Sequence, residues 1–130
     1  MISNARIQTF VRLFLPAYLF VLAAFGLYAS SFYSFILFHS LIEVACVMVL
    51  LTIFVLAWNA RELLDNHYIL FLGISFLSSA SFELVHLFAY KGFGVFSGYD
   101  TNLPTQLWIV FRYLFSTSLL IAPIFITRRL

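Results

Sequence analysis

The stretch FYSFILFHSLIEVACVMVLLTIFVLAW, residues 32–58, is almost entirely apolar, and it decides the fold class of this chain. A helix needs about 20 mostly apolar residues to cross a hydrocarbon core of roughly 30 Å, and this stretch is longer than that. It holds one acidic residue, Glu43, and one histidine, His39. We therefore predict a membrane-spanning helix that carries two energetically costly polar side chains.

Three more apolar stretches flank this one, and the predicted spans there cover about residues 9–28, 67–90 and 105–126. With 64% hydrophobic and 9% charged residues, the composition excludes an ordinary soluble domain. The few scattered charges, which sum to +2, also exclude a nucleic-acid-binding patch. We predict an all-α integral membrane fold in which residues 1–130 form a single domain, a bundle of four transmembrane helices.

The predicted orientation follows from the basic residues, because cytoplasmic ends and loops carry the excess of lysine and arginine. One side of the predicted bundle has only Lys91, and the other collects five arginines. These are Arg6, Arg12, Arg61, Arg128 and Arg129. Both termini are therefore expected to be cytoplasmic.

Polar side chains of three predicted spans fall at similar depths in the outer half of the membrane. At a rise of about 1.5 Å per residue, His39 and Glu43 lie about 10 and 16 Å below the outer start of the second span. Glu83 and His86 lie about 11 and 6 Å below the outer end of the third span, and Arg112 has a similar depth in the fourth. Members of each pair are three or four residues apart and share a helix face. We expect one polar cluster.

Metal binding is the first chemical use that this cluster suggests. His39, Glu43, Glu83 and His86 would supply imidazole and carboxylate ligands from two neighbouring helices, as in the metal sites of helical bundles. This donor set suits zinc, iron, copper or nickel, and the sequence does not choose among them.

Two other interpretations stay open. Arg112 could hold the anionic group of a small ligand, with Trp108 one turn above it and Tyr90 one turn beyond His86 as walls; haem is a less favoured variant. Alternatively, Arg112 pairs with the glutamates in a purely structural network. Polar contacts between membrane helices average only about 0.6 kcal/mol, so stability alone is a weak reason for the cluster.

The order of these residues resembles a known family. The resemblance rests on Phe38-His39 with Glu43, Trp58-Asn59-Ala60-Arg61, ELVHLFAYKG at residues 83–92, Gln106-Leu107-Trp108 and Arg112-Tyr113. Together they resemble the third type of bacterial membrane-associated sensor (MASE) domain, an input module at the N-terminus of histidine kinases and diguanylate cyclases. The match extends from Phe38 to Pro123, and Glu83 stands where the family usually has aspartate.

The resemblance implies a multi-pass protein of the bacterial inner membrane that senses a ligand in its outer half and relays it to a cytoplasmic output domain. Its expected partners are the lipid bilayer, a histidine kinase or diguanylate cyclase output domain missing from this chain, and a second copy in a homodimer. The chain has no catalytic output motif, and we do not expect an enzyme. The alternatives are a membrane redox or haem protein, a metal-dependent enzyme subunit, and a structural membrane protein.

Overall fold

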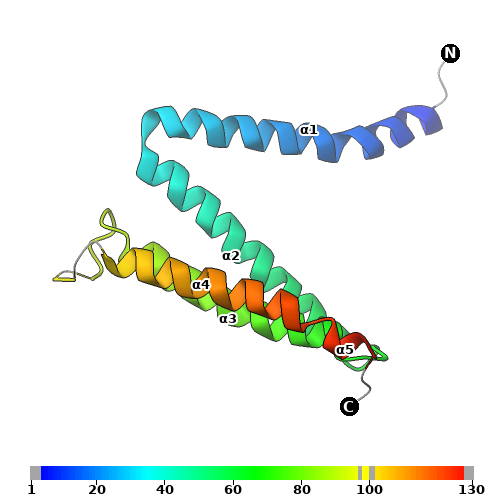
Figure 1. The fold of residues 1–130 in the computed structure, drawn as a ribbon. Helices are drawn as coiled ribbons and strands as arrows, with labels where there is room; N and C mark the ends of the chain where they lie inside the picture. Colours follow the sequence, from blue (N-terminus) through cyan, green and yellow to red (C-terminus); the bar gives the residue numbers. More distant parts are fainter. Residues whose placement is uncertain (1–3, 97, 100–101, 128–130) are drawn as a thin grey trace. The chain divides into compact units, whose positions relative to one another are not determined.

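The computed structural model describes residues 4–96, 98–99 and 102–127, and these residues form α-helices and no β-strand (Figure 1). The helices are α1 (Asn4–Tyr33), α2 (Phe35–Ala60), α3 (Tyr68–Ala89), α4 (Asn102–Ile121) and α5 (Ile124–Thr127). The prediction of an all-α fold is therefore confirmed for the described part of the chain.

Three of these helices are long and apolar enough to cross a membrane. The candidate spans are Val11–Tyr33, Phe35–Ala60 and Tyr68–Ala89. They identify a multi-pass membrane protein. Helix α4 is not among them, because Asn102, Gln106 and Arg112 lower its hydropathy.

The region of the fourth predicted span, residues 105–126, contains a break. Helix α4 ends at Ile121, a turn follows at Ala122 and Pro123, and α5 begins at Ile124. Proline lacks a backbone N–H, and its ring clashes with the preceding turn of a helix. The fourth predicted span, residues 105–126, crosses Pro123, and in the structure its helix is interrupted there.

Contacts divide the chain into residues 1–41 and residues 42–130. The first part contains α1 and the beginning of α2, and none of the most apolar window of α1 is buried. Its exposed side chains are largely leucine, phenylalanine, tyrosine and valine. Such a surface suits hydrocarbon, where no polar side chain is needed to cover it.

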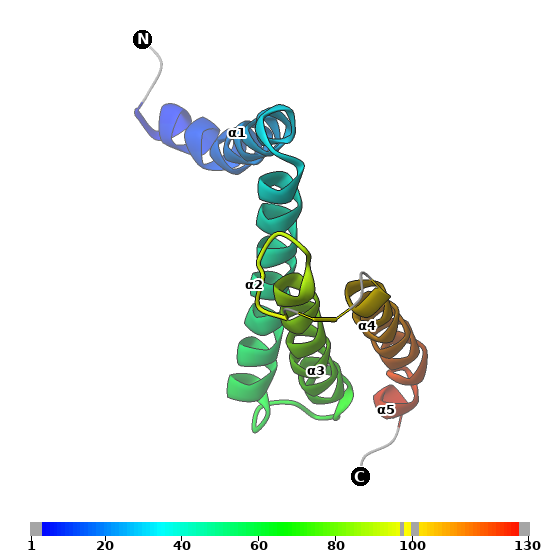
Figure 2. The same ribbon diagram turned by 90° about the vertical axis from the view of Figure 1, so that its left-hand side faces the viewer.

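The second part has a core built by three helices, with α3 beside both α2 and α4 (Figure 2). The core residues are Val47, Leu50, Leu72, Phe76, Ala80, Phe111 and Ala122. Aromatic rings extend it: Phe76 of α3 stacks on Phe115 of α4 with centroids 5.1 Å apart, and Phe71 stacks on Phe125 of α5 at 4.6 Å. Helix α3 is thus the central element of this part and has more buried residues than any other helix.

Candidate metal centre

His86 joins three helices through the two nitrogens of one ring. It lies on α3 and is 5% exposed. Its Nδ1 is 2.7 Å from the carbonyl oxygen of Pro104, in the first turn of α4. Its Nε2 is 3.1 Å from Oε1 of Glu43 on α2, and Glu43 is also buried. The imidazole is therefore held from both sides.

These two contacts determine where protons lie on the ring. A carbonyl oxygen can only accept a hydrogen bond, so Nδ1 carries a proton and donates it to Pro104. On the other side, a bare Nε2 and a carboxylate oxygen are both acceptors, and a hydrogen bond between them requires one shared proton. Once that proton leaves, the lone pair of Nε2 is available to a metal ion.

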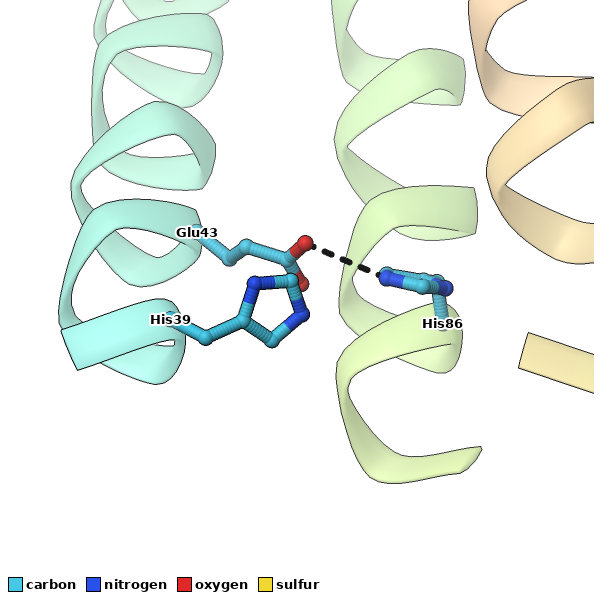
Figure 3. Close-up of side chains that lie close together, drawn as sticks. All are labelled: His39, Glu43 and His86. Atoms are coloured by element: carbon cyan, nitrogen blue, oxygen red, sulfur yellow. Dashed lines mark hydrogen bonds and ion pairs between the residues drawn. The ribbon is translucent and has the colours of Figure 1, made fainter. Parts of the chain in front are cut away.

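His39 brings a second imidazole to the same place. It precedes Glu43 by four residues on the continuous helix α2, so the two side chains share a face. One ligand atom each from His39, Glu43 and His86 lies within 4.8 Å of the others, and Figure 3 shows the three side chains converging. We call these three residues the His/Glu/His cluster.

The cluster has the composition of a metal site. Two imidazoles and one carboxylate form a donor set known for zinc and for non-haem iron. With metal–ligand bonds of about 2.0–2.2 Å in tetrahedral geometry, ligand atoms lie roughly 3.3 Å apart. The 3.1 Å between Nε2 of His86 and Oε1 of Glu43 matches that spacing. The three ligand atoms as a set lie within 4.8 Å of one another, so they would have to move closer together around an ion. A hydrogen bond from the other ring nitrogen to a carbonyl is the usual support of a metal-bound histidine.

Glu83, a predicted metal ligand, is buried but is not one of the three converging residues. It is 3% exposed and precedes His86 by one turn of α3. Within the described part of the chain, its Oε2 has no hydrogen-bond partner. Glu83 is thus an adjacent acceptor and not one of the three converging ligands.

The predicted ligand-binding residues belong to α4, which carries Trp108 and Arg112, and to the C-terminal end of α3, where Tyr90 is the cap. Arg112 and Trp108 are exposed on α4, with the guanidinium carbon 5.0 Å from the centre of the indole ring. The same carbon is 5.3 Å from the ring of Phe111. Tyr90 is half-buried at the end of α3, where its backbone N–H donates to Leu87. The structure thus brings Arg112 and Trp108 together on the surface of α4.

One member of the site was missed by sequence reasoning, the carbonyl of Pro104. Pro104 comes one residue before the fourth predicted span, residues 105–126, and was not a candidate site residue. Every residue has a carbonyl oxygen, so no sequence pattern marks the one that will accept a hydrogen bond from a distant histidine. The nearest signal was His86 itself, because a buried imidazole needs hydrogen-bond partners for its ring nitrogens.

The comparisons with known proteins agree with this architecture. The model of the MASE3 family, described as a membrane-associated sensor domain, matches residues 30–130. That range contains all members of the His/Glu/His cluster and Pro104. No curated protein and no solved structure matches the chain. The chain thus belongs to the MASE3 family of membrane-associated sensor domains.

Proposed function

We propose that this sensor domain is a non-enzymatic input module that binds a divalent transition metal ion, zinc, iron, copper or nickel, at His39, Glu43 and His86. The observation that carries the proposal is the convergence of three ligand atoms within 4.8 Å inside apolar helices. Glu83 enters as a fourth ligand after a change of side-chain rotamer, because it lies one turn from His86 with one oxygen unpartnered in the described structure.

The cost of burial supports a role in binding. Glu43 and Glu83 are 6% and 3% exposed, and each is the only acidic residue of its helix. Placing an acidic side chain at the centre of a membrane costs about 2.5–3.5 kcal/mol on insertion scales. An inter-helix polar contact returns on average about 0.6 kcal/mol. A bound cation compensates the buried negative charge more fully than a helix-to-helix contact does.

The membrane arrangement belongs to the same proposal. Helix α4 with α5 is proposed as the fourth span, with both termini cytoplasmic in the bacterial inner membrane and the His/Glu/His cluster in the outer half. Metal binding changes helix packing, and a homodimer passes the change to a histidine kinase or diguanylate cyclase output domain. Signalling requires that the ion bind one packing more tightly than another.

A second candidate is an anionic ligand at Arg112. The guanidinium lies against Trp108 and Phe111, which is a favourable environment for a cation. An arginine within a membrane helix is stabilised by pairing with an anionic group. In this alternative, Arg112 and Trp108 bind the ligand, Tyr90 closes one side, and the His/Glu/His cluster is structural.

Metal titration of the purified chain in lipid nanodiscs tests the proposal. Zinc is measured by elemental analysis and competition with a chelating dye, and cobalt by the visible bands of a tetrahedral or five-coordinate site. We expect one ion per chain, and a loss of affinity of about 100-fold or more in His86→Ala and His39→Ala, beyond the 10–100-fold typical of outer-shell substitutions.

The matched control is His67→Ala, because His67 is the third histidine and is exposed just before α3. This variant should bind zinc like the unaltered chain. Absence of stoichiometric binding by the unaltered chain, or an equal loss in His67→Ala, would contradict metal binding at the cluster. If the unaltered chain binds an anionic probe and Arg112→Gln does not, the second candidate would be supported instead.

A further inference from the structure

We infer that the carbonyl of Pro104 is the positioning group of the centre: it holds the imidazole of His86 with Nδ1 protonated and Nε2 directed at α2, and it thereby couples the occupant of the site to the first turn of α4. The metal-dependent half of this inference rests on the proposed function. The coupling of His86 to α4 does not, because it is a property of the chain itself.

The first step is the strength of the contact. Nδ1 and the carbonyl oxygen are 2.7 Å apart, which is short for an N–H···O hydrogen bond. Both residues are buried. Breaking this bond would leave a buried donor and a buried acceptor unsatisfied, which is unfavourable for both groups. The imidazole and the Pro104 carbonyl therefore move together.

The second step is the stiffness of the element that carries the carbonyl. Pro104 is the third residue of α4, which begins at Asn102. Backbone N–H groups in the first turn of a helix have no partner within the helix, so proline costs no hydrogen bond there. Its ring also fixes φ. When the Pro104 carbonyl moves, the first turn of α4 therefore moves with it as one rigid unit.

The third step is the position of His86 between two other helices. Its Nε2 reaches Glu43 on α2 at 3.1 Å, while its backbone belongs to α3. When a metal ion replaces the shared proton, the ring shifts to meet the ion. Because Nδ1 stays bonded to Pro104, the shift is carried to α4. One side chain thus connects the ion to an element that contributes no ligand.

Two substitutions of His86 distinguish the contact of Nδ1 with Pro104 from the contact of Nε2 with Glu43. Asparagine places an amide N–H near the position of Nδ1, and glutamine reaches as far as Nε2. His86→Asn should therefore keep the bond to Pro104 and lose the ligand. His86→Gln should keep a polar group toward Glu43 and lose the bond to α4. Neither variant should bind zinc as tightly as the unaltered chain.

The readout is the distance between spin labels on α3 and α4. Cysteines at the exposed positions Leu84 and Gln106, in a Cys46→Ala background that removes the native thiol, report the separation of the two helices by pulsed electron resonance in nanodiscs. Without metal, His86→Asn should reproduce the distance of the labelled parent chain. His86→Gln should shift or broaden it by about 1–2 Å, the size of helix shifts in switching proteins.

Zinc should change the distance between the two spin labels in the parent chain. It should leave that distance unchanged in His86→Asn. If His86→Gln and His86→Asn both match the parent without metal, the coupling through Pro104 is overturned. If zinc binds but the parent distance stays fixed, the relay to α4 is overturned while the metal proposal stands. If zinc does not bind, the proposed function fails, and the metal-free comparison still decides the coupling.

Nitrogen-15 spectra of histidine-labelled chain give a signature that a merely structural role of His86 would not produce. We expect Nδ1 of His86 to be protonated with and without zinc, and the zinc-dependent change to fall on Nε2. Assignment uses His39→Gln and His67→Gln. A bare or metal-bound Nδ1 in either state would overturn the inference. Should His86→Gln fail to fold, this measurement on the unaltered chain decides the question alone.

Discussion

Gly73 of α3 lies directly against Ala57 of α2. A β-carbon at position 73 would come within 2.5 Å of the Ala57 Cβ and within 3.4 Å of the Phe54 Cα. Ala57 is itself only 1% exposed. Membrane helices associate through such small residues because their backbones can approach closely. This contact fixes the spacing of α2 and α3, the two helices that carry the His/Glu/His cluster.

Gly73→Val should destabilise the packing of α2 on α3 by about 1–3 kcal/mol, because the larger side chain has no space against Ala57. Gly73→Ala should have a smaller effect in the same direction. The measurement is the thermal midpoint in detergent, followed by zinc titration. Gly26→Ala is the control, since its added Cβ meets nothing within 4 Å. Equal stability of Gly73→Ala and Gly26→Ala would contradict the close contact.

Glu43→Gln should separate stability from metal binding. The amide can keep a hydrogen bond to Nε2 of His86, so the free energy of unfolding should change by no more than about 1 kcal/mol. The carboxylate ligand is lost, however, and zinc affinity should fall about 100-fold. Glu62→Gln, at an exposed acidic residue, is the matched control. Unchanged zinc affinity in Glu43→Gln would remove Glu43 from the ligand set.

Zinc binding should weaken as the pH falls. The proton shared by His86 and Glu43 must leave before the metal binds, so protons and zinc compete for the same atoms. For one displaced proton, the affinity should change about tenfold per pH unit, and it should be higher at the higher pH. Calorimetric titrations between about pH 6 and pH 8 measure this slope. A flat profile would show that the ion binds elsewhere.

Glu83 is expected to strengthen zinc binding without being essential to it. Glu83→Gln removes the carboxylate of the proposed fourth ligand, and the zinc affinity should fall about tenfold, less than for Glu43→Gln, because Glu83 reaches the ion only after a change of rotamer. Glu83→Asp keeps the carboxylate and should bind within a few-fold of the unaltered chain. Competition titration with a chelating dye distinguishes these outcomes. A loss in Glu83→Gln as large as in His86→Ala would instead make Glu83 a primary ligand.

The local features of the fold could be predicted from the sequence. Long apolar stretches predicted the helices that became α1, α2 and α3, because a helix is the form in which an apolar segment satisfies its own backbone in a membrane. Helix ends were less certain: α1 runs to Tyr33 and α2 starts at Phe35, whereas the expected boundary lay near residues 28–32. Few polar residues marked that boundary.

The candidate site was predictable in part for the same reason. The spacings of His39 with Glu43 and of Glu83 with His86 depend only on helical periodicity, and both pairs lie on the predicted helices. Which side chains meet across helices depends on how each helix is rotated about its axis. Close packing at contacts such as Gly73 against Ala57 sets that rotation.

The sequence by itself determined that the chain is helical, enters a membrane and carries a layer of imidazole and carboxylate groups. These properties follow from hydropathy and from the 3.6-residue period, which are local. Only the tertiary structure decided that His86 meets Glu43 and the Pro104 carbonyl, that Glu83 stays beside the cluster, and that Arg112 lies exposed over Trp108. Those contacts join residues far apart in the chain, and their geometry arises from packing between helices.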